Sequence, residues 1–78
     1  MKQIKVYGPG CKRCLATAEM VEAAAARLGV PVTVEKVTDL RAMAMAGIMS
    51  TPGVAVDGKV VHAGGLPDAA KVEGWLTP

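Results

Sequence analysis

The sequence predicts an α/β fold in the order βαβαββα, with a four-stranded mixed sheet flanked by three helices. Short runs rich in Val and Ile alternate with polar residues, which is typical of strands. A long stretch of strong helix formers separates the first two runs, and Asp-Gly joins the last two. Because 78 residues bury only a small core, we expect residues 1–78 to form a single domain.

The first strand is expected over residues 2–7 (KQIKVY), and the Gly-Pro-Gly sequence at 8–10 ends it. The helix that follows is expected to begin at Cys11 and to end at Leu28. Gly29 then occupies the position that favours a left-handed backbone after a helix. Apolar residues recur every three or four positions, which predicts a core-facing stripe of Leu15, Ala18, Val21, Ala25 and Leu28.

The β-branched run 32–37 (VTVEKV) predicts a second strand. It should run parallel to the first strand because a helix connects the two. Thr38 or Asp39 is expected to cap a short helix that reaches Ala46, and Gly47 should end it.

Two antiparallel strands are expected at 54–56 and 60–62, joined by a type I′ turn at Asp57-Gly58. Gly64-Gly65 then opens a loop. Pro67 suits the first position of a last helix, which would end near Trp75 or Leu76.

Composition excludes two broad classes of function. The net charge is only +2, and one Trp and one Tyr are the only large aromatic residues, so we expect no nucleic-acid binding. No stretch approaches the ~20 apolar residues that span a bilayer, and the first residues alternate instead of forming the apolar core of a signal peptide. We therefore expect a cytoplasmic protein that does not bind membranes.

The two cysteines, Cys11 and Cys14, stand two residues apart in "YGPGCKRC". Such a pair can be a structural disulfide, a metal site or a redox couple. A structural disulfide is disfavoured because the cytoplasm is reducing and because a very short loop gains little entropic stabilisation. Zinc is disfavoured because two Cys and the distant His62 fall short of four ligands. We expect no metal.

A redox couple fits the predicted position of the pair at the start of a helix. Unsatisfied N–H groups and the helix dipole favour an anion there, and Lys12 and Arg13 add positive potential. These effects should lower the thiol pKa of Cys11 from ~8.5 toward neutrality or below. Cys14 lies about one turn further on the same face, within reach of a disulfide. Cys11 is therefore the expected nucleophile and Cys14 the resolving thiol.

With Cys11-Lys12-Arg13-Cys14 at the first helix and Thr51-Pro52 before the third strand, the chain resembles the thioredoxin superfamily. It is most similar to the small redox-active disulfide proteins of bacteria and archaea. The resemblance covers essentially the whole chain and implies a minimal thioredoxin-like fold. It also implies a monomeric thiol–disulfide oxidoreductase with protein disulfides as substrates. No bound cofactor is implied, and electrons would come from an external thiol or a flavin-dependent disulfide reductase.

The resemblance also implies roles for residues beside the pair. Pro52 would be cis and Thr51 would offer its backbone to the substrate, although the residues alone indicate only an ordinary trans turn. The segment from Gly64 to Asp68 resembles the glutathione site of glutaredoxins, so glutathione is a candidate ligand of Gly64, Gly65 and Asp68. The simpler interpretation is a loop followed by a first-turn acid. The remaining candidate substrate-binding residues are Gly10, Lys12 and Arg13.

The chain departs from thioredoxin at several positions. Gly10 stands where thioredoxin has Trp, and the residues between the cysteines are basic. Thioredoxin buries an Asp six residues before its first cysteine, where this chain has Lys5.

The main alternative is a carrier of Cu(I) or heavy metals, in which the same two thiolates bind the ion. Such carriers have the order βαββαβ and usually Met-x-Cys before the pair, which this chain lacks. Three further methionines could indicate soft-metal binding, but filling of a core without Phe is the simpler interpretation of Met43, Met45 and Met49. Tyr7 either walls the site or packs at the end of its strand.

Overall fold

The computed structural model describes residues 2–8 and 12–77. Its elements follow the predicted order, and most bounds lie within two residues of those expected. They are β1 (Lys2–Tyr7), α1 (Lys12–Leu28), β2 (Val32–Val37), α2 (Leu40–Met45), β3 (Gly53–Val56), β4 (Lys59–Ala63) and α3 (Ala69–Leu76).

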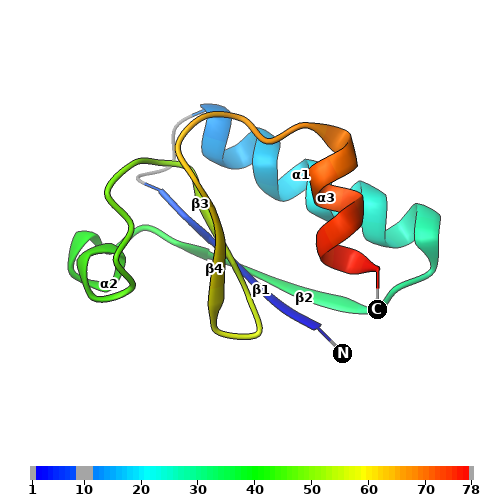
Figure 1. Cartoon of the computed structure of the whole chain (residues 1–78), viewed down its shortest axis with the longest axis horizontal. Coiled ribbons are helices and arrows are strands. Elements are labelled where there is room, and N and C mark those ends of the chain that lie inside the picture. Colours follow the sequence, from blue (N-terminus) through cyan, green and yellow to red (C-terminus); the bar gives the residue numbers. More distant parts are fainter. Residues whose placement is uncertain (1, 9–11, 78) are drawn as a thin grey trace.

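The strands form one mixed sheet in the order β2-β1-β3-β4 (Figure 1). β1 and β2 run parallel, with Val6 opposite Lys36, whereas β3 is antiparallel to both β1 and β4. Asp57 and Gly58, at φ +50° and +88°, make the turn between β3 and β4. Positive φ at both positions is the feature of a type I′ turn. The fold class predicted from the sequence is confirmed.

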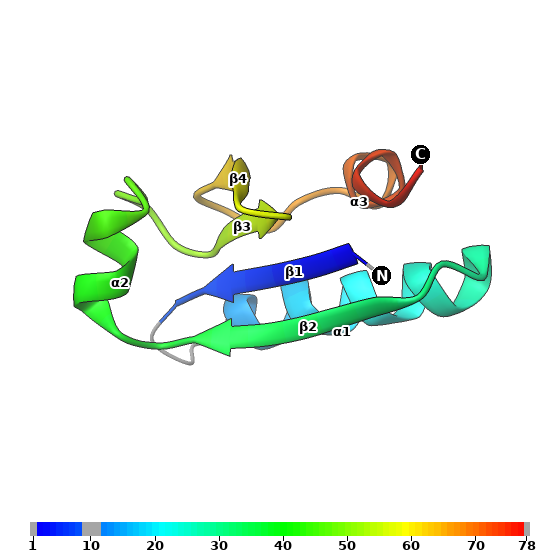
Figure 2. The ribbon, with the colours of Figure 1, turned by 90° about the horizontal axis from the view of Figure 1, so that it is seen from below.

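α1 and α3 lie side by side on one face of the sheet, and α2 lies apart from them at the end where β1 and β2 finish (Figures 1 and 2). The main core lies between the sheet and these two helices. Its fully or nearly fully buried members are Ile4, Val6, Ala18, Val21, Ala24, Ala25, Val54, Val72 and Leu76.

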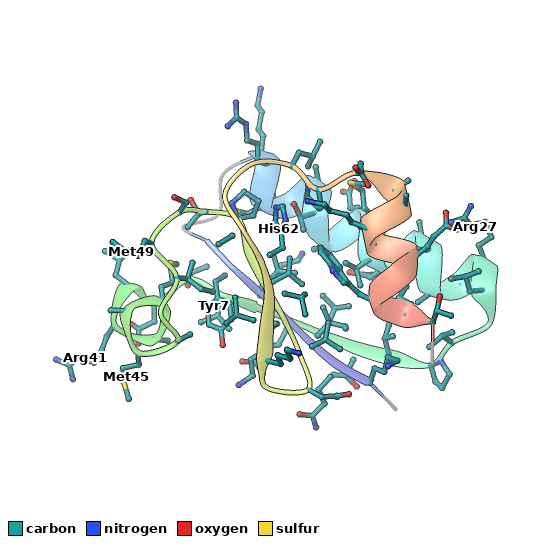
Figure 3. The ribbon with its side chains drawn as sticks, in the orientation of Figure 1. Tyr7, Arg27, Arg41, Met45, Met49 and His62 are labelled. Atoms are coloured by element: carbon teal, nitrogen blue, oxygen red, sulfur yellow. The ribbon has the colours of Figure 1, made fainter. Side chains whose placement is uncertain are left out.

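A second, smaller core lies beneath α2. Tyr7, Met43, Ile48 and Ala55 form it. Tyr7 therefore packs at the end of its strand, which is the simpler of its two interpretations. Met43 fills this core as expected, but the same expectation is wrong for Met45 and Met49, which are 83% and 96% exposed. Figure 3 shows both of them projecting from the outer side of this end of the molecule.

The buried stripe of α1 differs from the predicted one. Leu15 and Leu28 are each 43% exposed, so their assignment to the core is wrong. The stripe begins instead at Cys14 and includes Thr17, whose hydroxyl donates to the carbonyl of Arg13 at 2.7 Å. The residues at the centre of the stripe are small, so α1 packs closely against the sheet. The larger side chains of Leu15 and Leu28 lie outside this contact.

α3 begins two residues later than predicted. Pro67 is buried before the helix rather than at its first position, and Asp68 is the N-cap. Asp68 has extended backbone, and its Oδ1 accepts from the N–H of Lys71 at 2.9 Å. Asp39 caps α2 in the same way, accepting from the N–H of Arg41 at 3.0 Å. A capping carboxylate satisfies an N–H that the helix leaves unpaired, which sets both starting points.

Candidate active site

The candidate site lies where β1 ends and α1 begins. Gly10 and Cys11 lie outside the described residues, so the described part of the cysteine motif is Lys12, Arg13 and Cys14. Cys14 is in the first turn of α1 and is only 5% exposed. Lys12 and Arg13, in the same turn, are exposed. The turn carries no acidic residue, so its charge is positive throughout.

Gly8 allows Cys14 to approach the end of β1. The N–H of Gly8 donates to the carbonyl of Val37 at 2.9 Å, which holds its backbone against β2. A Cβ placed on Gly8 would overlap Cys14 Sγ and would lie 3.8 Å from Cβ of Thr51. Only a glycine therefore fits between these neighbours. The end of β1, the first turn of α1 and the residues before β3 converge at this point.

Thr51 and Pro52 approach the cysteine segment from the loop before β3. The peptide bond between them is cis, as the family resemblance implies. Pro52 is fully buried and Thr51 is half-buried. The carbonyl of Pro52 accepts from the N–H of Gly64 at 3.0 Å, so the loop after β4 lies directly beside this segment.

His62 and Trp75 hold the loop at Gly64 and Gly65. Nε2 of His62 lies 2.8 Å from the carbonyl oxygen of Gly65. Because a carbonyl only accepts, Nε2 is the protonated nitrogen. The His62 ring also contacts that of Trp75, with centroids 5.8 Å apart and planes at 52°. In Figure 3, His62 lies between β4 and the helices. β4, this loop and α3 are thus joined by one half-buried side chain.

Asp68 is exposed and stands at the end of the same loop. Its Oδ1 serves as the N-cap of α3, so Asp68 stands directly before the first turn and the interpretation of Asp68 as a first-turn acid is wrong. The carboxylate has a structural task that accounts for its presence.

Residues 2–77 match a family model described as a thioredoxin domain. The chain belongs to the thioredoxin superfamily. It is 36% identical over 73 residues to a protein named thioredoxin from Methanocaldococcus jannaschii, an alignment that covers 94% of this chain and 84% of that protein. It is 29% identical over 77 residues to a protein named thioredoxin from Methanothermobacter thermautotrophicus, covering 99% of this chain and all of that protein.

One departure from thioredoxin has a structural counterpart. Lys5, at the position where thioredoxin buries an Asp, is exposed and points to the sheet face opposite α1, since its neighbours Ile4 and Val6 face α1. The position therefore contributes neither an acid nor a buried charge beneath Cys14.

Among residues 2–8 and 12–77, no three His, Cys, Asp or Glu side chains come together as a metal site. Within the same ranges, none of the helices combines the length and the apolar character needed to cross a bilayer.

The structure brings Cys14 and Thr51 together at Gly8, a neighbour that the sequence did not indicate. A turn alone explains a Gly-Pro-Gly sequence, so the sequence gives no sign that Gly8 lies against Cys14. The sequence also did not indicate that Lys36 faces α1 from β2, which follows from its pairing with Val6.

Proposed function

We propose that the protein is a cytoplasmic thiol–disulfide oxidoreductase that acts as a monomer on protein disulfides. Membership of the thioredoxin superfamily and the relatives named thioredoxin support this proposal. The observation that carries it is the position of Cys14, nearly buried in the first turn of α1 and in contact range of Gly8. A second cysteine, Cys11, precedes it by three residues.

The burial of Cys14 supports the division of roles between the two thiols. Thiol–disulfide exchange needs access for the attacking sulfur, and Cys14, a residue that is only 5% exposed, is poorly placed to meet a protein substrate first. We therefore assign the first attack to Cys11 and the second to Cys14.

The reaction proceeds in two exchanges. The Cys11 thiolate attacks one sulfur of the substrate disulfide, forms a mixed disulfide and releases the other substrate sulfur as a thiolate. The Cys14 thiolate then attacks the Cys11 sulfur, which closes the Cys11–Cys14 disulfide and releases the second substrate thiolate. Two electrons pass from the protein to the substrate. The two protons of the original thiols end on the substrate thiols, directly or through solvent.

The substrate chain would lie against Thr51 and Pro52, with Gly10, Lys12 and Arg13 on its other side. The contact between Gly64 and Pro52 supports a continuous wall on the β4 side of this groove. The Cys11–Cys14 couple is itself the redox group, so no bound cofactor is required. An external thiol or a flavin-dependent disulfide reductase would return the electrons.

Glutathione is a candidate external thiol, with Gly64, Gly65 and Asp68 as its binding residues. Asp68→Asn separates this role from capping, because Asn keeps an acceptor oxygen for the N–H of Lys71 and removes the charge. If Asp68 binds glutathione, Asp68→Asn slows reduction of glutathione disulfide relative to 2-hydroxyethyl disulfide. If the ratio of the two reduction rates were the same in Asp68→Asn and in the wild type, Asp68 would not bind glutathione and would only cap α3.

The experiment that tests the proposal is capture of the mixed disulfide. The Cys14→Ser variant should accumulate a covalent complex with a disulfide substrate, because the resolving thiol is gone, and Cys11→Ser should form none. Non-reducing gels and intact mass report the complex. Equal capture through Cys14 would contradict the assigned roles. Stoichiometric Cu(I) binding against a competing chelator, without a measurable disulfide couple, would establish the metal carrier instead.

A further inference from the structure

A small hollow opens beside Cys14 on the side of β2. It has a volume of about 100 Å³. Its walls are mostly apolar, and its lining residues are Val6, Gly8, Cys14, Leu15, Lys36 and Thr38. Lys36 is the charged residue of this set.

The register of the sheet explains why Lys36 reaches the hollow. Lys36 is paired with Val6, and Val6 belongs to the core between the sheet and α1, so both residues face α1. The preceding pair, Lys5 and Glu35, faces the opposite side of the sheet. Lys36 is exposed, so its aliphatic stem lines the hollow while its ammonium group stays in water.

Positively charged side chains stand on both of the elements that border the hollow, β2 and α1. Lys12 and Arg13 stand in the first turn of α1, which has no acidic residue. Among residues 2–8 and 12–77, Arg27 forms an ion pair with Glu73, whereas Lys12, Arg13 and Lys36 form none. The acids nearest to Lys36 along the chain are Glu35, which faces the other side of the sheet, and Asp39, which is the N-cap of α2.

We propose that this hollow is a subsite for an acidic side chain that flanks the cysteine of a protein disulfide substrate. This inference rests on the proposed function and names the substrates that the site prefers. A carboxylate at the mouth of the hollow would meet the ammonium of Lys36, while the methylene groups of the same side chain would contact Leu15, which is 43% exposed. Lys12 and Arg13 would attract the same substrates over a longer range, within the ~10 Å over which charges act at moderate salt.

The test compares two disulfide-linked peptide dimers, one of capped Glu-Cys-Glu and one of capped Gln-Cys-Gln. The reduced full-length protein reduces each dimer under pseudo-first-order conditions, and each rate is divided by the rate with dithiothreitol. This division removes the intrinsic effect of flanking charge on the disulfide. We expect the acidic dimer to be preferred about fivefold at low salt, which is the upper end of what one solvent-exposed ion pair contributes. The preference should shrink as the ionic strength rises.

Lys36→Gln should lower this preference to about twofold or less, the remainder being due to Lys12 and Arg13, Lys36→Arg should retain it, and Lys36→Glu should lower it further. The matched control is Lys5→Gln, which removes the same charge from the neighbouring strand on the opposite face and should keep the preference. An equal preference in wild type and Lys36→Gln would overturn the assignment. The assignment would also be overturned if the preference for the acidic dimer were lost in the Lys12→Gln/Arg13→Gln double variant but kept in Lys36→Gln. Failure to reduce either dimer would instead contradict the proposed function itself.

Discussion

At the scale of single residues, the space around Cys14 depends on Gly8. A Cβ at this position would overlap Cys14 Sγ, and the neighbouring backbone is held by the hydrogen bond to Val37. Gly8→Ala should therefore lower the free energy of unfolding by about 1–3 kcal/mol, the usual cost of overpacking. It should also slow the resolution of the mixed disulfide, because the sulfur that performs this step must move. Urea denaturation and stopped-flow exchange measure the two effects.

Gly74→Ala is the matched control for this prediction. Gly74 lies within α3, is exposed, and has no atom near its missing Cβ. Alanine should raise the free energy of unfolding there by about 0.5–1 kcal/mol, because it favours the helix and fills open space. If both variants shifted stability in the same direction, the argument from steric overlap at Gly8 would be wrong.

At this scale the sequence shows features that are local along the chain and does not show those that depend on the register of the strands. The spacing of Cys11 and Cys14 and the Thr51-Pro52 pair are visible in the sequence. The position of Lys36 beside Cys14 is not visible there, because it follows from the pairing of Lys36 with Val6 on another strand. Gly8 was missed for a related reason, since nothing along the chain indicates that Cys14 packs against it.

At the scale of elements, His62 links β4, the loop at Gly65 and α3. His62→Ala removes the hydrogen bond to Gly65 and the ring contact with Trp75. The loss of one hydrogen bond and one aromatic contact predicts a decrease of about 1–2 kcal/mol in the free energy of unfolding. Trp75 fluorescence and urea denaturation report the change.

The substitution His62→Gln keeps a donor for the Gly65 carbonyl but loses the ring, so it should fall between wild type and alanine. Lys59→Ala, at an exposed position of the same strand, is the control and should change stability by less than about 0.5 kcal/mol. A His62→Ala variant as stable as Lys59→Ala would show that the loop does not need this side chain.

The caps of the two short helices offer a second prediction at this scale. Asp68→Ala should lower the free energy of unfolding by about 1 kcal/mol, because the N–H of Lys71 loses its acceptor. Asp68→Asn should recover most of this loss. Thermal denaturation followed by circular dichroism distinguishes the two. Equal losses for both variants would mean that charge, and not capping, is what stabilises the start of α3.

The sequence predicted the elements better than their exact ends and faces. Alternation and the Asp-Gly turn located all four strands within about one residue. The predicted start of α3 was wrong because Pro67 was placed at the first helical position. Asp68 is the stronger capping residue, and the helix begins directly after it. Leu15 was assigned to the core on periodicity alone, but the helix is turned so that small residues face the sheet.

At the scale of the whole molecule, α3 closes the main core. Leu76 and Val72 are fully buried against α1 and the sheet. Leu76→Ala should therefore cost about 2–5 kcal/mol of the free energy of unfolding. Leu40, which is 72% exposed on α2, provides the matched substitution, and Leu40→Ala should cost less than about 0.5 kcal/mol. Similar losses in urea denaturation would mean that the core does not lie where the structure places it.

The architecture of the whole chain could be predicted because the local sequence patterns and the rules for connecting strands indicate the same arrangement. Strand patterns, the connecting helix and the hairpin turn allow few arrangements other than one mixed sheet with its first two strands parallel. The exposure of Met45 and Met49 did not follow, since apolar residues at helical spacing indicate a buried face only when a neighbour covers it.

The central claim is that Cys11 and Cys14 form a reversible two-electron couple. Equilibration of the full-length protein in graded dithiothreitol and glutathione buffers, followed by alkylation and intact mass, measures it directly. We predict one transition between a dithiol and an intramolecular disulfide, with a slope of about 30 mV for each tenfold change in the ratio of the two forms. If both thiols remained alkylatable at every potential, or if only glutathione adducts formed, the claim would be contradicted.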